Sequence, residues 1–433
     1  MAPGNGTVDL EMSTFLNMNL SWLFEDSTIV WSLGAVFVSL ISYFCIGSYK
    51  VRPTSSKAQR AKAMRQAFKA IASGTTPSPS QGQKSHNHAP LNALQISQLW
   101  VYPMKSIRGC AVSHAMLSRE GFYLDRRFML LKDHEETPRK LENMHVPDFP
   151  NMSLFHTSIE FDRLIVSYRA PGTTKPSGET LEVLLEPPNL GKLEKLAINM
   201  HNSPTTAYDM GERCNKWFSE RFGFKVVLAY WGGNPRLVLG NLPGRPANQT
   251  RKERNVITRV MSQVPVIGSL LGDDEDDIIA FNDCAPYLVI NEKSVDDVSA
   301  RLPEEMEMDY TKFRANIVVK GADDAFEEDY WGELTFGEES EIILTGNCAR
   351  CKSLNVDYNT GAAGTGEDGK ILKLLQKDRR VDPGMKYSPI FGRYGFASKK
   401  SEGKVLAIGD SVSISRKNDE RTVFYWPGIS TTS

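Results

Sequence analysis

The chain has 433 residues, of which 41% are hydrophobic, so it is long enough to bury the cores of two or three domains. Its formal net charge of -1 hides an asymmetry, because eleven Lys and Arg but no acidic residue lie between Asp26 and Glu120. The remainder of the chain is therefore net acidic, which is not the pattern of a uniformly basic nucleic-acid-binding protein. Six cysteines are too few for a disulfide framework in a chain of this length, which favours a reducing compartment.

The first expected element is a transmembrane helix over 27–49. These 23 residues contain no charged side chain, and a helix of that length spans roughly 34 Å, enough to cross the hydrocarbon core. No basic residue precedes the segment, which argues against a cleaved signal peptide, and basic residues follow it from Lys50 onward. The positive-inside rule therefore predicts a short acidic tail over 1–26, an anchor, and a cytosolic remainder.

Residues 50–93 are expected to form a linker. The Ala-rich, basic stretch 57–71 has two interpretations, a helix lying on anionic lipid or a solvated charged linker, and the sequence leaves both open. The stretch 73–90 is rich in Pro, Ser and Gly, which is typical of a flexible tether.

Residues 94–240 are predicted to form a first domain made mainly of strands. The expected strands lie at 95–101, 112–117, 127–131, 154–168 (a hairpin) and 181–185, and a helix is expected at 212–222. Strands outnumber helices, which favours a β-barrel-like domain over a doubly wound sheet. No glycine-rich nucleotide-binding motif follows any of these strands.

Two features of this first domain carry chemistry. Lys105 and Ser106 place a cation and a hydroxyl on one turn, a pair that suits a phosphate oxygen. Arg126 and Arg127 stand together at the start of an expected strand. Taken singly, each feature is more often a solvated surface than a binding site.

Residues 241–430 are predicted to form a second domain, after an irregular charged insertion over 243–277. Strands are expected at 287–290, 313–319, 342–344, 404–408 and 412–414, with one helix capped by Ser294 and another over 371–377. The predicted fold class is therefore α+β, mostly β, preceded by the transmembrane helix.

The sequence Gly-Asn-Cys-Ala-Arg-Cys over 346–351 is the most informative stretch. The two cysteines could be half of a zinc site, a redox dithiol, ligands of a soft metal, or core residues. A zinc site needs a second pair that the sequence lacks, and the turn residues at 357–361 do not fit the helix expected after a redox dithiol. Arg350 favours a thiolate, the metal-binding form. In a strand, however, Arg350 and Cys348 would point to one face and Cys351 to the other.

The motif Asn-Cys-Ala-Arg-Cys, followed by Val-Asp-Tyr-Asn-Thr-Gly, resembles the signature of the MOSC family, a domain named after the C-terminal part of molybdenum cofactor sulfurases. From about residue 94 onward the arrangement is similar to that of the mitochondrial amidoxime-reducing components. The resemblance implies a MOSC N-terminal β-barrel-like domain over 94–240 and a MOSC β-barrel domain over 241–430.

The resemblance also implies a binding site for the molybdenum–molybdopterin cofactor. Cys351 is implied as the molybdenum ligand and a catalytic residue, and Asp283 as a second catalytic residue that also contacts the cofactor. Cys284 stands where we expect a hydroxyl residue, so its contact is in doubt. The implied cofactor-binding residues are Lys105, Ser106, Arg126, Asp283, Cys284, Arg314, Asn316, Ala349 and Arg350.

The implied activity is the two-electron reduction of N-hydroxylated compounds, with electrons from NADH through cytochrome b5 and its reductase. The sequence has no haem, flavin or iron–sulfur motif, so an external electron donor is expected. The alternative is a protein that binds or carries the cofactor without turnover. A full sulfurase is not expected, because residues from 94 onward leave no room for its pyridoxal-phosphate domain. By the same resemblance the anchor belongs in the outer mitochondrial membrane, with the endoplasmic reticulum as the other option.

Overall fold

The computed structural model describes residues 94–244 and 277–431, all of which belong to one compact unit, Ile71–Ser433. The predicted acidic tail, anchor and linker, and most of the predicted insertion, lie outside the described residues. Within the described ranges, no helix is both long and apolar enough to span a bilayer.

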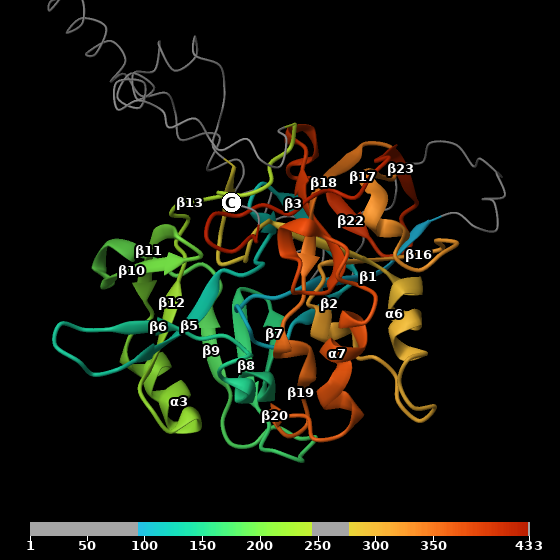
Figure 1. Ribbon diagram of the computed structural model, residues 1–433. Coiled ribbons are helices and arrows are strands. Elements are labelled where there is room, and N and C mark those ends of the chain that lie inside the picture. The colour runs from blue at the N-terminus through green and yellow to red at the C-terminus, as the bar shows by residue number, and fades with distance from the viewer. Residues whose placement is uncertain (1–93, 245–276, 432–433) are drawn as a thin grey trace, which may run out of the picture. The chain divides into compact units, whose positions relative to one another are not determined.

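The largest sheet has eight strands and carries the cysteine motif (Figure 1). Its two ends meet, because Gln95, in the second strand of the order given below, forms an antiparallel bridge with Ser411, just before the last strand, and the backbone N–H of Val412 donates to Leu94 O over 2.8 Å. This bridge curls the sheet back onto itself. In order, its strands are β2 (Cys110–Val112), β1 (Gln95–Val101), β16 (Ile317–Lys320), β15 (Tyr287–Asn291), β21 (Ile390–Ala397), β18 (Ser340–Ala349), β17 (Trp331–Phe336) and β23 (Val412–Lys417).

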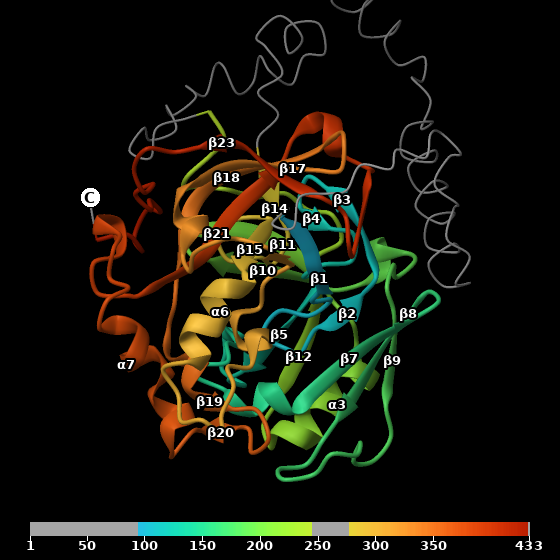
Figure 2. The same cartoon turned by 90° about the vertical axis from the view of Figure 1, so that its right-hand side faces the viewer.

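A second group of strands comes from the first half of the chain. One sheet of five runs β10 (Lys195–Met200), β11 (Ser203–Asp209), β12 (Val226–Tyr230), β5 (Phe128–Asp133) and β6 (Leu141–Asn143). Figure 1 shows helix α3 (Glu212–Phe222) beside β12. A sheet of three, visible in Figure 2, consists of β7 (Phe155–Glu160), β8 (Arg163–Tyr168) and β9 (Leu181–Leu184).

The sheets cross the predicted domain boundary at residue 240. Strands β1 and β2 belong to the first half of the chain, yet β1 pairs with β16, placing Leu99 opposite Ile317. Strand β22 (Val405–Ala407) likewise pairs with β3 (His114–Ser118), which pairs with β4 (Gly121–Phe122). The short pairs β13–β14 (Arg236–Leu237 with Ile278–Ile279) and β19–β20 (Val356–Asp357 with Ala362–Ala363) complete the strands. The division into two domains at this point stays a prediction.

The mostly-β class and the helices predicted within the described ranges are confirmed, with one correction at a helix start. Helix α3 has the predicted bounds, and α7 spans Ile371–Gln376. Helix α6 spans Glu292–Ser299, but its cap is Asn291, whose side chain accepts from the N–H of Lys293 over 3.0 Å. Ser294 lies inside the helix and donates to the buried Glu328 instead, over 2.8 Å.

The predicted strand at 313–319 starts too early. Residues Tyr310–Phe313 form a 3₁₀ helix, η4, and Arg314 follows it with φ 57°, so β16 begins only at Ile317. The left-handed residue turns the chain before the strand. The Arg314 carbonyl O then accepts from Arg126 Nη2 over 3.0 Å, a contact that no sequence period could indicate.

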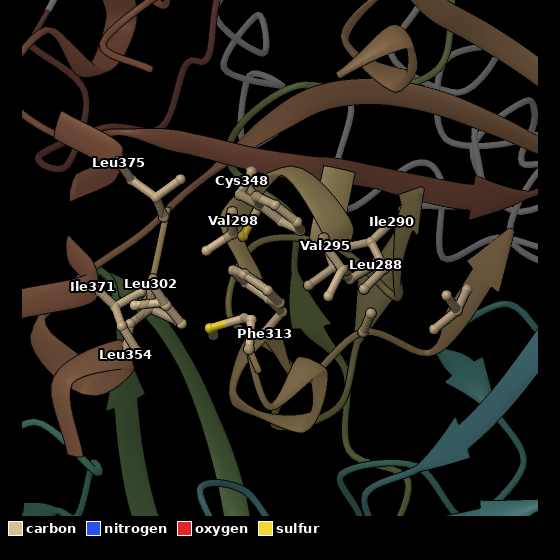
Figure 3. Packing of buried hydrophobic residues seen from close by; sticks show 14 residues of the cluster. Leu288, Ile290, Val295, Val298, Leu302, Phe313, Cys348, Leu354, Ile371 and Leu375 are labelled. Atoms are coloured by element: carbon tan, nitrogen blue, oxygen red, sulfur yellow. The ribbon is translucent and has the colours of Figure 1, made fainter. Parts of the chain in front are cut away.

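The core next to the cysteine motif is aromatic and aliphatic (Figure 3). The rings of Phe313 and Phe391 stack with centroids 3.7 Å apart, and Cys348 lies among the apolar side chains of this cluster. The buried stack of η4 on β21 fixes the chain just before Arg314.

A buried ion pair also supports this half of the fold. Asp329 has no solvent-exposed side-chain area, and both of its carboxylate oxygens accept from Arg379 Nη2 over 2.8 Å, while Arg421 Nε donates to Oδ2 over 2.8 Å. The carboxylate therefore ties the segment after α7 and the segment after β23 to the chain before β17.

We expect Asp329→Ala to lower the free energy of unfolding by about 3–5 kcal/mol, because it leaves the Arg379 guanidinium buried without its carboxylate. Urea unfolding of the variant measures the loss. Glu338→Ala, which removes an exposed carboxylate from the adjoining β17–β18 turn, is the control and should shift it by less than about 0.5 kcal/mol. Equal midpoints for the two variants would contradict the role given to the buried pair.

Candidate functional site

Lys105 and Asp283 meet in the structure although they are 178 residues apart. Lys105 is held on its turn by its backbone N–H, which donates to Phe128 O over 2.8 Å. Its side chain is 6% exposed and forms a short ion pair with Asp283, whose side chain is 55% exposed. One end of this pair is therefore buried and the other is open to solvent.

Asp283 is positioned and charged by its neighbours. Arg236, which is fully buried, donates from Nη2 to the backbone O of Asp283 over 2.9 Å and so fixes the turn that carries it. Burial alone would raise the pKa of Asp283, but Lys105 and His201 outweigh it and hold the pKa well below its usual range. Asp283 is therefore a carboxylate at neutral pH.

Arg126 and Arg314 both lie against the ring of Tyr102. Their guanidinium carbons stand 4.9 Å and 4.5 Å from the Tyr102 ring centroid. Arg126 also forms a short ion pair with the buried Asp125, and Arg314 donates from Nη1 to Ile107 O over 2.6 Å. Arg314 Nη2 is buried and has no hydrogen-bond partner among the described residues. A buried cationic N–H without an acceptor fits a site that receives an anionic group.

Asn316 supports Arg126 rather than facing open space. It is 1% exposed; its Oδ1 accepts from Arg126 Nη1 and from the N–H of Leu288, each over 3.2 Å, and its Nδ2 donates to Trp100 O over 3.2 Å. Both the oxygen and the nitrogen of the Asn316 side-chain amide are therefore already hydrogen-bonded within the protein. Its predicted contact with the cofactor stays a prediction, whereas its contact with Arg126 is direct.

Sequence reasoning missed several members of this cluster. Arg108 stands over the Tyr358 ring at 4.4 Å and Lys312 Nζ at 5.5 Å, so Tyr358, which follows the cysteine motif, lies among the cations. Ser106, which was predicted, follows Lys105 with φ 63° and is half-buried. The Asp-Tyr pair within the quoted family signature was the available signal for Tyr358.

Two histidines also approach the site. His201 Nε2 lies 3.4 Å from Asp283 Oδ1, and the His145 ring stacks at 6.5 Å from that of His201. Burial, aided by Lys105, lowers the pKa of His145 to about 4, so that ring is neutral at physiological pH. Neither residue stands in a pattern that sequence inspection could single out; His201 occupies the β10–β11 turn with φ 53°.

The two cysteines of the motif have opposite environments. Cys348 lies on β18 and is 3% exposed, whereas Cys351, just beyond the strand, is exposed and lies 3.2 Å from Ser353 Oγ. Arg350 donates from Nη1 to Cys348 Sγ over 2.9 Å. Arg350 is thus buried beside Cys348 and contacts its thiol, but β18 ends at Ala349, so Cys351 is separated from Cys348 by the end of the strand and not by the predicted alternation along it.

Arg350 also joins the motif to Lys105, Arg126 and Arg314, which we call the cation cluster. Its Nη2 donates to the backbone O of Phe313 over 2.9 Å, directly before Arg314. Ala349, the last residue of β18, pairs with Ile390 of β21 and so fixes the strand end from which the motif leaves the sheet. The exposed Cys351 thiol therefore follows a segment that is anchored at both the sheet and η4.

Cys284 lines a cavity of about 10 Å³ together with Thr345 and Tyr394. Burial, with a further contribution from Asp283, raises the pKa of its thiol. A cavity of this size holds about one water molecule. The structure thus gives Cys284 a protein environment in this cavity, and its predicted contact with a cofactor stays a prediction.

The predicted residues form one cluster with an excess of positive charge. Lys105 pairs with Asp283 and Arg126 with Asp125, whereas Arg314 forms no ion pair with a carboxylate of the described residues. Of the missed residues, Arg108 pairs with Asp309 over 3.8 Å, and Lys312 adds to the excess. In the described ranges there is no group of three or more His, Cys, Asp or Glu side chains that could hold a metal ion.

We expect Cys351 to be the first of the two thiols to react with iodoacetamide in the folded protein, because Cys348 is buried between Arg350 and the apolar cluster. Peptide mass spectrometry over time gives the rates, and Cys348 should react only after denaturant is added. Faster labelling of Cys348 would contradict the assignment of the open thiol.

Two domain families match the chain along most of the described ranges. The MOSC N-terminal beta barrel domain matches residues 93–225, and the MOSC domain matches residues 276–413. The chain is 30% identical over 329 residues to mitochondrial amidoxime reducing component 2 of Bos taurus, covering 73% of this chain and 82% of that protein.

Two human proteins are also similar. Mitochondrial amidoxime-reducing component 1 is 26% identical over 327 residues, covering 73% of this chain and 82% of that protein. Molybdenum cofactor sulfurase is 24% identical over 298 residues, which cover 66% of this chain but only 29% of that protein. The chain therefore belongs to the MOSC family, as a relative of the mitochondrial amidoxime-reducing components.

Proposed function

We propose that this protein is a molybdenum-cofactor-dependent oxidoreductase that reduces N-hydroxylated compounds. Its relatives are named for amidoxime reduction or for the molybdenum cofactor, and 82% of the length of the bovine relative is covered. The observation that carries the proposal is the exposed Cys351 thiol. The residue before it, Arg350, donates a hydrogen bond to the backbone O of Phe313, directly before Arg314 of the cation cluster.

The residues present fit the molybdenum–molybdopterin cofactor. Its phosphate needs cations, and Lys105, Arg126 and Arg314 would supply them, with Arg314 Nη2 still lacking an acceptor among the described residues. Its metal needs a soft ligand, which the Cys351 thiolate would provide. When bound, the cofactor would supply a two-electron centre for removing oxygen from the substrate.

The chain's own residues would bind and orient this group. Asp125 and Asn316 hold the Arg126 guanidinium, and Tyr102 packs against both Arg126 and Arg314, so the positive charges would be fixed before an anion arrives. Reduction of an N-hydroxyl group to an amine also consumes two protons and releases water. We propose that these protons are delivered at Asp283, where Lys105 Nζ and His201 Nε2 both contact the carboxylate.

The electrons would come from NADH through cytochrome b5 and its reductase, since the sequence carries no redox-cofactor motif of its own. The membrane anchor over 27–49 would hold the enzyme at the outer mitochondrial membrane, with the endoplasmic reticulum as the alternative. A carrier that holds the cofactor without turnover is the second candidate, which the likeness to a molybdenum cofactor sulfurase favours.

We expect Cys351→Ser to abolish reduction of benzamidoxime in the presence of NADH, cytochrome b5 and its reductase, while pterin content falls little because the phosphate contacts remain. Cys348→Ser is the matched control and should keep most of the activity. The opposite pattern would move the metal ligand to Cys348. Wild-type protein that is full of cofactor yet reduces no N-hydroxylated compound would favour the carrier.

We expect Arg126→Gln to lower the pterin content of purified protein roughly tenfold or more, because loss of one buried charged contact costs about 2–5 kcal/mol. Arg127→Gln is the control: this neighbouring side chain donates to Glu120 over 3.1 Å and stands over Trp231, on a different side of the chain. Fluorescence of the released, oxidised pterin measures the content. Equal content in both variants would remove Arg126 from the site.

A further inference from the structure

One surface beside the cysteine motif is strongly basic and has no role in the site described above. Lys373, Lys377, Arg380 and Lys386 are all exposed, and they lie on or just after α7. None of the four forms an ion pair with a carboxylate of the described residues. We call these four residues, together with Tyr387, the α7 basic face.

The α7 basic face lies next to Cys351. The N–H of Leu372 donates to Asn355 Oδ1 over 2.9 Å, which joins the start of α7 to the short helix η6 (Lys352–Asn355) that begins directly after Cys351. On the other side, the N–H of Arg350 donates to Pro389 O over 2.8 Å. Both ends of the basic segment are thus hydrogen-bonded to residues flanking the thiol.

Folding does not require this arrangement of charge. Lys373 and Lys377 are four residues apart, on the face of α7 opposite the buried Ile371 and Leu375. Like charges at this spacing repel and slightly destabilise a helix. The nearby acids are occupied elsewhere: Asp378 pairs with Arg301, and Asp382 is buried and accepts from Asn347 Nδ2 over 2.7 Å. These exposed cations are therefore available for contact with something outside the chain.

The face also carries an apolar anchor. Tyr387 is 67% exposed, and its backbone O accepts from Gln376 Nε2 over 3.4 Å. Lys386 Nζ lies 4.9 Å from the Tyr387 ring centroid. Tyrosine and arginine are the residue types that most often dominate the binding energy at the centre of protein interfaces.

We propose that the α7 basic face is the docking surface for an acidic electron-carrier protein that delivers electrons next to Cys351. The identification of the partner as an electron donor rests on the proposed function. A redox partner must bring its centre close to the metal, and the basic face borders the only exposed thiol of the described residues. Complementary charge would speed the encounter and orient the partner, and salt would weaken it.

The test compares two triple charge reversals in the full chain loaded with cofactor. One variant is Lys373→Glu/Lys377→Glu/Arg380→Glu. The control is Lys192→Glu/Lys195→Glu/Lys216→Glu, three exposed lysines from the first half of the chain; α3, which bears Lys216, stands apart from α7 in both views (Figures 1 and 2). Binding of the soluble haem domain of cytochrome b5 is measured by calorimetry at about 20 mM and about 200 mM NaCl, which brackets strong and weak screening.

We expect the α7 variant to bind the haem domain at least roughly tenfold more weakly than wild type at low salt, and to lose most of the salt dependence. The control variant should bind like wild type. With dithionite-reduced methyl viologen as a small electron donor, the α7 variant should reduce benzamidoxime at the wild-type rate, because none of its substitutions lies in the cofactor site.

Unchanged affinity of the α7 variant would overturn the docking surface, whatever the turnover. So would a loss confined to binding of vesicles that contain phosphatidylserine, because the face would then be a membrane contact. If wild type binds the haem domain through this face but turns over no substrate with either donor, the docking surface stands and the proposed reductase activity falls. The two ideas therefore fail separately.

Discussion

The site depends on one buried guanidinium. Arg350 is almost fully buried, and it reaches both the Cys348 thiol on β18 and the backbone of η4 at Phe313. A buried cation is costly unless it is hydrogen-bonded, so these contacts hold the strand end and η4 together. Every residue proposed to touch the metal or the phosphate on this side, from Arg314 to Cys351, is placed through that arginine.

The second constraint is an excess of fixed positive charge in a folded site. Lys105, Arg126 and Arg314 come from turns that the chain reaches at quite different points, and all three turns contain a residue with positive φ: Ser106, Arg126 and Arg314. Such backbone is unfavourable for side chains larger than glycine. The mutual repulsion of the cations would be offset when an anion binds, so this site is suited to the proposed phosphate.

The proposed electron path follows from the same geometry. Cys351 is exposed because β18 ends at Ala349 and the chain leaves the sheet, while η6 and α7 pack behind it through apolar residues such as Leu354 and Leu375. Those apolar contacts force the polar face of α7 outward. The segment that bears the basic residues is hydrogen-bonded on both sides of the cysteine motif, so a partner that docks on it would lie close to the proposed metal.

The sequence by itself determined the mostly-β class and the bounds of β1 and α3, because each depends on periodicity over a few neighbouring residues. It also marked Lys105, Arg126 and Arg314 through a family motif. Only the tertiary structure decided that Asn316 supports Arg126, that Asn291 caps α6 in place of Ser294, and that Tyr102, Tyr358 and His201 join the site. These residues meet through contacts between segments far apart in the chain. A local sequence pattern cannot predict such contacts, because they depend on how distant turns pack against one another.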